Sequence, residues 1–99
     1  MSKTKPILPL EAAPGWLIKA AASELALWRR WGRRVNGLAI TSIGVVVARA
    51  NQWPLPEAKS VLGQLAHLDP VLVEAIAKAP ASEAHRLLPP RSAEQLKLL

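Results

Sequence analysis

The sequence predicts an all-α fold, a small bundle of four main helices with a short C-terminal helix and an extended N-terminal arm. Apolar residues recur at helical spacing through most of the chain, and prolines stand where helices begin or end. Hydrophobic residues make up 51% of only 99 residues, and a chain this short holds one modest core. We therefore assign residues 1–13 to the arm and residues 14–99 to a single small helical domain.

The N-terminal arm carries prolines at positions 6 and 9. Proline removes a backbone donor and disfavours helix at the residue before it, which predicts extended chain up to residue 13. Two interpretations of this arm remain open. It is either a frayed terminus or a segment that packs three apolar side chains onto a neighbour, namely Ile7, Leu8 and Leu10.

The first helix is predicted to begin near Pro14, because proline suits the first helical turn, and to run to about Val35. Its polar residues fall within an arc of about 140° on a helical wheel: Lys19, Ser23, Arg29, Arg30, Arg33 and Arg34. The opposite arc is apolar and holds Leu17, Ile18, Ala20, Ala21, Leu25, Leu27, Trp28, Trp31 and Val35. We expect the arginines to face solvent and the tryptophans to face the core. Glu24 falls within the apolar arc, so it lies at the edge of the packed face or meets a cation from another element or subunit.

Residues 35–52 admit two interpretations. Asn36 followed by Gly37 is a turn signal, and the β-branched residues of 40–47 favour a strand or hairpin. The apolar run shows no alternation and is longer than an ordinary strand, which favours a buried helix, and this is our prediction. In a helix, small residues at spacings of four, three and four form a seam that another helix could approach closely: Gly37, Thr41, Gly44 and Ala48.

A bilayer location is the alternative for residues 35–53. This stretch holds one charged residue, Arg49, and is flanked by tryptophans and arginines, as membrane boundaries often are. Its charge-free part, residues 35–48, would span about 21 Å as a helix, whereas the hydrocarbon core of a bilayer is about 30 Å thick. We therefore predict a helix buried in a bundle and keep a position in or on the bilayer as an alternative.

The second half of the chain consists of short helical patterns separated by prolines. The first, residues 56–68, has one apolar face and ends near His67, which we interpret as a solvated or capping residue. Asp69 and Pro70 form an N-cap and a first-turn proline, which predicts a helix over residues 70–79 that Pro80 ends. Residues 82–88 fit a short helical turn, and a capping box at residues 92–95 predicts a final helix over residues 93–98.

The residue patterns of common catalytic and metal sites are missing. The chain has no cysteine, which excludes disulfides, thiolate metal sites and cysteine nucleophiles. Its histidines, His67 and His85, are 18 residues apart without a carboxylate at ligand spacing, and there is no phosphate-binding glycine loop or Ser/His/Asp arrangement. We expect a non-enzymatic protein with no cofactor, no metal ion and no small-molecule substrate.

The formal net charge of +6 lies entirely in the N-terminal half. Residues 1–54 hold eight lysines and arginines against Glu11 and Glu24, so 8 − 2 = +6, whereas residues 55–99 hold five cations and five anions. This asymmetry indicates an anionic partner, such as nucleic acid or a lipid headgroup, for the first half only.

Tryptophan and arginine are enriched in binding hot spots, and here they are interleaved. We therefore predict a protein–protein interaction module, an adaptor, accessory or regulatory subunit of a larger assembly. It binds another protein or a second copy through the Trp/Arg amphipathic helix and the apolar segment beside it. Its candidate binding residues are Glu24, Trp28, Arg29, Arg30, Trp31, Arg33, Arg34, Arg49 and Trp53. Nucleic-acid binding through the arginines of 29–34 and membrane association through 35–53 are the alternatives. The first 15 residues hold three prolines and no apolar run of signal-peptide length, so we expect a cytoplasmic protein.

Overall fold

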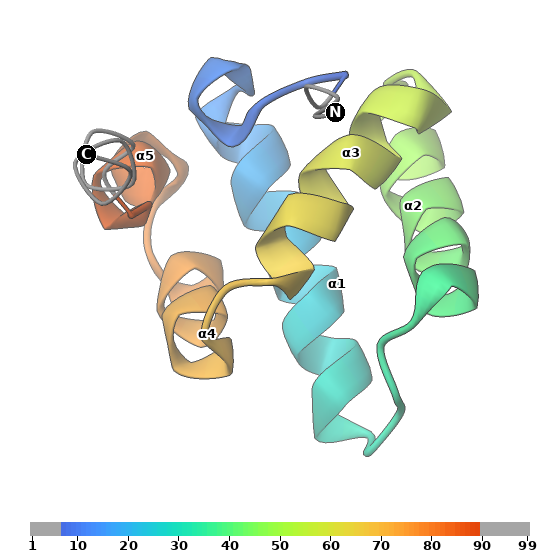
Figure 1. Cartoon of the computed structure of the whole chain (residues 1–99). Helices are drawn as coiled ribbons and strands as arrows, with labels where there is room; N and C mark the ends of the chain where they lie inside the picture. The colour runs from blue at the N-terminus through green and yellow to red at the C-terminus, as the bar shows by residue number, and fades with distance from the viewer. Residues whose placement is uncertain (1–6, 90–99) are drawn as a thin grey trace, which may run out of the picture.

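The computed structural model describes residues 7–89. Within them the chain forms a bundle of five α-helices and two single turns of 3-10 helix (Figure 1): η1 Leu10–Ala12, α1 Gly15–Arg30, α2 Gly37–Asn51, α3 Leu55–Ala66, α4 Pro70–Lys78, η2 Ala81–Glu83 and α5 Ala84–Leu87. Between residues 7 and 89 there is no strand, and the predicted all-α class is confirmed. The C-terminal helix expected over residues 93–98 lies outside the described residues.

Helix α1 is the centre of the bundle. It contacts α2, α3, α4 and the segment formed by η2 and α5. Figure 1 shows α4 and α5 on one side of α1 and α2 on the other. The fully buried side chains of Leu17, Ile18 and Leu25 belong to the same core as Leu62 of α3 and Ile76 of α4. Helices α2, α3 and α4 thus each pack against α1.

The solvent-facing side of α1 differs from the prediction. Leu27 and Trp31, which the helical wheel assigned to the core, are 39% and 66% exposed. Arg29, assigned to a solvated arginine face, is half-buried on the side of α1 that meets α3. The expected separation of solvated arginines from buried tryptophans therefore fails at Arg29 and Trp31, whereas Arg30, Arg33 and Arg34 are exposed and Trp28 packs against the core as predicted.

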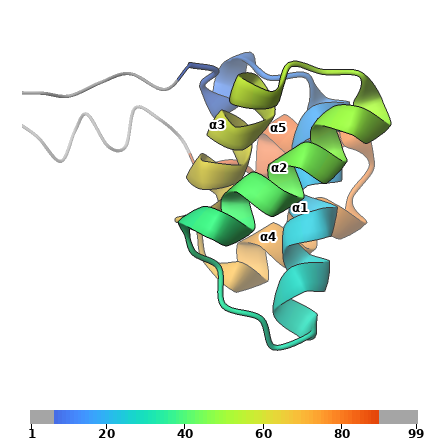
Figure 2. The same ribbon diagram turned by 90° about the vertical axis from the view of Figure 1, so that its right-hand side faces the viewer.

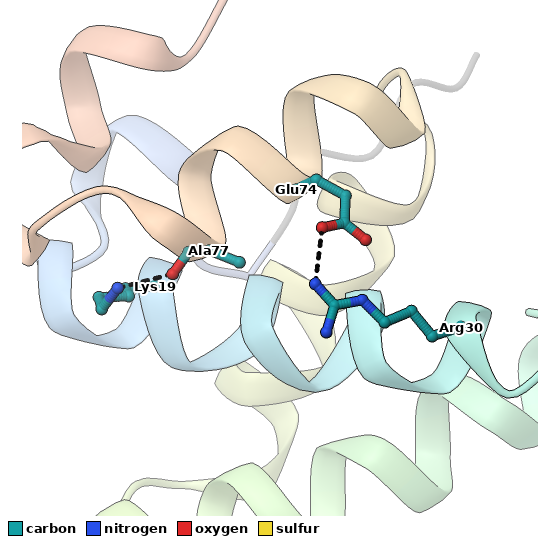
Figure 3. Close-up of polar contacts among 4 residues, drawn as sticks. All are labelled: Lys19, Arg30, Glu74 and Ala77. Atoms are coloured by element: carbon teal, nitrogen blue, oxygen red, sulfur yellow. Dashed lines mark hydrogen bonds and ion pairs between the residues drawn. The ribbon is translucent and has the colours of Figure 1, made fainter.

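Cations of α1 bind the carboxyl ends of the neighbouring helices. Lys19 Nζ donates at 2.6 Å to the carbonyl oxygen of Ala77, at the end of α4 (Figure 3). It also donates at 2.7 Å to the carbonyl oxygen of Ala79, one residue beyond the helix. Arg29 Nη2 donates at 3.2 Å to the carbonyl oxygen of Ala66, the last residue of α3. The last carbonyls of a helix lack partners within the helix and carry partial negative charge, so a cation stabilises them. A polar side of α1 can therefore be packed instead of solvated.

Helix α1 ends at Arg30, five residues before the predicted end at Val35. Gly32 has a φ of 74°, in the left-handed region that glycine adopts without steric cost. Its N–H donates to the Arg29 carbonyl at 2.9 Å, and the Arg33 N–H donates to the Trp28 carbonyl at 3.3 Å. This pair of bonds is a Schellman motif, which closes a helix. Residues 33–35 consequently belong to the α1–α2 connection.

Residues 37–51 form α2, so the helix prediction for this segment is confirmed and the hairpin interpretation is wrong. Asn36 is the N-cap, and its Oδ1 accepts a hydrogen bond from the Ala39 N–H at 3.0 Å. The asparagine thus begins a helix here instead of a hairpin turn. Gln52, left-handed with a φ of 50°, ends the helix. No helix within residues 7–89 has both the length and the apolar character needed to cross a membrane.

The small-residue seam of α2 is used over only part of its length. Gly44 and Ala48 are buried, and a Cβ on Gly44 would lie 2.8 Å from the Cγ of Lys59 in α3. Gly37 and Thr41 are exposed. Helix α2 therefore approaches α3 closely through its middle and its carboxyl half, while Gly37 and Thr41 of the seam face solvent.

Residues 7–13 lie against α3. The Leu8 carbonyl accepts from Gln64 Nε2 at 2.7 Å, and the Leu10 N–H donates to Gln64 Oε1 at 3.1 Å. Leu10 is buried and Ile7 is exposed. Residues 10–12, expected to be extended, form the 3-10 turn η1 because the Ala12 and Ala13 N–H groups donate back to carbonyls three residues earlier.

The later helices agree with the sequence patterns. Helix α3 is formed within one residue of its predicted start, and α4 begins after Asp69, whose Oδ1 accepts the Val71 N–H at 2.8 Å. Of residues 82–88, predicted as a short helical turn, 82–87 fall in η2 and α5, and Leu88 is the C-cap residue of α5. His67 is the exposed C-cap residue of α3, as expected.

Candidate interaction surface

Residues 28–34, here called the Trp/Arg turn, form a compact unit at the end of α1. The Trp28 Nε1–H donates to the Arg34 carbonyl oxygen at 3.1 Å. The Arg33 guanidinium lies over the Trp28 ring, 5.0 Å from its centroid, and 5.8 Å from the centroid of Trp31. These cation–π contacts and the indole hydrogen bond fold the turn back on the helix. Trp31, Arg33 and Arg34 are all exposed.

The outward side of α2, here called the α2 face, continues from this turn. It consists of Leu38, Thr41, Ser42, Val45, Val46 and Arg49. Leu38 is 81% exposed and Val46 is 51% exposed. Figure 2, seen from the side of α2, shows no other described element covering it. Positions 38, 42, 45 and 49 follow spacings of four, three and four, so they form one line along the helix.

The two parts of this surface share an unbalanced charge. Between Glu24 and Glu57 the sequence has no carboxylate, and it carries five arginines: Arg29, Arg30, Arg33, Arg34 and Arg49. Arg30 is neutralised by Glu74 of α4, with Nη2 and Oε1 3.1 Å apart (Figure 3). Among residues 7–89, the arginines at 33, 34 and 49 form no ion pair. The exposed charge of this surface is therefore positive at both ends of α2.

The structure brings together only some of the predicted binding residues. Trp28, Trp31, Arg33 and Arg34 form the Trp/Arg turn, and Arg49 lies at the far end of the α2 face. The remaining four residues do not contribute to this surface. Arg29 and Arg30 fall within residues 28–34, but their side chains bind α3 and α4. Glu24 is half-exposed on α1 without a partner among the described residues, and Trp53 packs edge-on against Trp16 with ring centroids 5.3 Å apart.

The sequence analysis placed Leu38 and Val46 in the apolar segment beside the Trp/Arg helix, but it did not name either of them as a binding residue. The run does not alternate between apolar and polar residues, so it predicted a buried helix without an exposed side. A signal was present in the seam of small residues: the side of α2 that carries Gly44 and Ala48 approaches another helix, so a residue on the opposite side, such as Val46, is free to be exposed.

Within the described part of the chain, no three metal-ligating side chains are grouped as they would be around an ion. The side chains that are unusually exposed are instead aromatic, aliphatic and guanidinium groups, which are suited to binding another macromolecule by packing and charge. No known protein family matches this chain, and no curated protein or solved structure shows significant similarity to it, so function has to be inferred from the surface itself.

Proposed function

We propose that this chain is a small, non-enzymatic helical protein-interaction module. It docks on a partner protein through the Trp/Arg turn and the α2 face. The observation that carries the proposal is the exposure of large apolar side chains beside unpaired arginines, with Trp31 at 66% and Leu38 at 81%. Single exposed apolar residues are ordinary on protein surfaces. Here they occur on consecutive elements and are of the types enriched in hot spots.

Folding does not account for these side chains. The core is formed by other residues, and removal of Trp31 or Leu38 would uncover little of it, because both side chains are mostly exposed and neither belongs to the core cluster. Exposed apolar groups of this size favour association, so a chain that retains them beside three unpaired arginines has the composition of a binding surface. Packing of Arg33 on Trp28 and Trp31 also restrains these side chains before a partner arrives.

The test is co-purification from the cells that produce the protein. A tagged chain carrying Trp31→Ala and Leu38→Ser is compared with the tagged wild type, and the associated proteins are quantified by mass spectrometry. The matched control is Val71→Ser, which removes an apolar side chain that is 76% exposed on α4, across α1 from α2. We expect specific partners to be lost from the double variant and retained by the control. The same set of proteins from all three chains would refute the proposal.

Nucleic-acid binding is the second candidate, favoured by one specific observation. The helical wheel placed both tryptophans opposite the arginines, whereas the structure leaves Trp31 exposed beside Arg33 and Arg34. A base can stack on an exposed indole while arginines contact phosphates. The test is binding of a single-stranded oligonucleotide over a range of salt concentrations. Replacing both arginines by alanine should reduce the log–log salt slope by about 1.4, and a flat salt dependence of the wild type would eliminate this candidate.

A further inference from the structure

We infer that the α2 face binds an acidic amphipathic helix of a partner protein, one with an apolar middle and carboxylates at both ends. This inference rests on the proposed function and specifies the partner's chemical class. It follows from the spacing of the apolar side chains on the face, from the distribution of charge along it, and from the poor fit of the other occupants.

The apolar part of the face has the length and spacing of a helix contact. Helix α2 has 15 residues, which corresponds to about 22 Å at 1.5 Å per residue. Leu38, Ser42 and Val45 lie on one line along it, with Val46 beside them. Ser42 is smaller than Leu38 and Val45 on either side of it, so a crossing helix can place a side chain against α2 at this position. A helix of about four turns, laid along α2, would cover the whole line.

The cations lie at the two ends of this apolar line. Arg33 and Arg34 precede the first turn of α2, where the helix dipole adds partial positive charge. Arg49 lies in the last turn, on the same line as Leu38. No carboxylate occurs in residues 25–56, so the segment supplies no anion of its own to this face. A complementary helix therefore carries Glu or Asp near both ends and apolar residues between them.

A second copy of this chain does not satisfy these charges. In an antiparallel pair of α2 helices, Arg49 of each copy would lie beside the first turn of the other, next to Arg33 and Arg34. In a parallel pair, Arg49 would face Arg49. Both arrangements place like charges together at the ends of the contact, which opposes association.

A membrane surface and a nucleic acid also fit the face less well. An interfacial helix keeps its cations beside its apolar face, near the headgroups. Here Arg49 lies on the apolar line itself, so burying Val45 in lipid would carry the guanidinium with it. A nucleic acid would meet phosphate-binding groups only at the ends of the face, with Leu38 and Val46 between them.

The experiment uses two synthetic helical peptides of about four turns. Both have leucines along one face; one has glutamates in its first and last turns, and the other has lysines there. Each is titrated into the full ¹⁵N-labelled chain and followed by amide chemical shifts. We expect the acidic peptide to shift the amides of α2 and the lysine peptide to bind at least tenfold more weakly. Leu38→Ser with Val46→Ser should abolish the shifts, and Val71→Ser should leave them unchanged.

The arginines are tested in the same titration. Arg33→Ala with Arg34→Ala should weaken binding of the acidic peptide about threefold to tenfold and reduce its salt dependence. The inference is overturned if both peptides bind equally, if neither shifts α2, or if α2 responds to anionic vesicles, an oligonucleotide or rising protein concentration and not to the acidic peptide. Should the peptide fail while natural partners still require Trp31 and Leu38, only the partner class is wrong. If those partners are also indifferent to both residues, the proposed function fails as well.

Discussion

Replacing Lys19 by methionine tests whether the cations of α1 hold the bundle together. Lys19 Nζ makes two charge-assisted hydrogen bonds, at 2.6 and 2.7 Å, to the carbonyls of Ala77 and Ala79. Methionine retains most of the aliphatic stem and removes the ammonium group. The substitution therefore leaves the packing of α1 against α4 largely in place while the last carbonyls of α4 lose their donor.

The expected loss in the free energy of unfolding follows from the number and kind of these hydrogen bonds. A hydrogen bond to a charged group contributes about 1.5–3 kcal/mol. Lys19 is only half-buried, and water can replace part of what it supplies to two carbonyls, so we take about 2 kcal/mol for the pair together. For a domain of this size, each kcal/mol corresponds to about 4–8 °C in the melting temperature. The Lys19→Met chain should therefore melt about 8–16 °C below the wild type.

The assay is thermal unfolding followed by far-ultraviolet circular dichroism, with Lys78→Met as the matched control. Lys78 is an exposed cation in the last turn of α4, the helix whose end Lys19 binds. It has no hydrogen bond or ion pair within residues 7–89. Its loss removes only a helix-dipole interaction of about 0.3–1 kcal/mol. Equal shifts in the two variants, or a change of less than about 2 °C for Lys19→Met, would show that the two hydrogen bonds do not stabilise the fold.

Three further substitutions test other parts of the structure by chemical denaturation. Arg29→Ala should lower the free energy of unfolding by about 1–2 kcal/mol, because the guanidinium binds the carbonyl end of α3. Arg34→Ala is the control and should change this free energy by less than about 0.5 kcal/mol. Equal effects of the two substitutions would contradict the contact between Arg29 and α3. Gly44→Leu should cost about 1–3 kcal/mol, because even a Cβ would lie 2.8 Å from Lys59 Cγ, and an unchanged midpoint would contradict the close approach of α2 and α3. Gly32→Ala should cost about 1 kcal/mol through the positive φ alone, since nothing lies within 4 Å of the added Cβ; a gain in stability would mean that α1 continues through this position.

Where the helices begin was predictable because the signals are local. The Asp69 cap and the following proline act on the N–H groups of the next turn, and no distant residue has to be known to interpret them. The end of α1 was also locally encoded, by Gly32, and was missed because the helical wheel continued to look favourable beyond it. A glycine directly after the C-cap residue, here Gly32 after Trp31, ends a helix even where the apolar and polar residues keep their helical spacing beyond it.

The orientation of α1 could not be predicted in the same way. A wheel separates polar from apolar residues, but it does not say which side other helices will cover. Arg29 is packed because the last turn of α3 offers it a carbonyl, and Lys19 because the end of α4 does the same. Those acceptors come from residues 37 and 58 positions away along the chain. Whether a lysine or arginine side chain is buried therefore depends on tertiary structure. The same holds for Leu27 and Trp31, which are exposed because the neighbouring helices cover other sides of α1.

The same glycine that ends α1 also assembles the candidate surface. If α1 continued to Val35, Arg33 would project from a different side of the helix than Trp28 and Trp31 and could not fold back over their rings. The left-handed turn at Gly32 reverses the chain, places Arg33 on the indoles and brings Arg34 in front of the first turn of α2. A Gly32→Ala chain that remains folded should therefore lose affinity for the acidic peptide more than Arg34→Ala does, because it disturbs both arginines at once. Unchanged affinity in that variant would mean that the arginines reach the partner without the turn, and that the Trp/Arg turn and the α2 face are not a single surface.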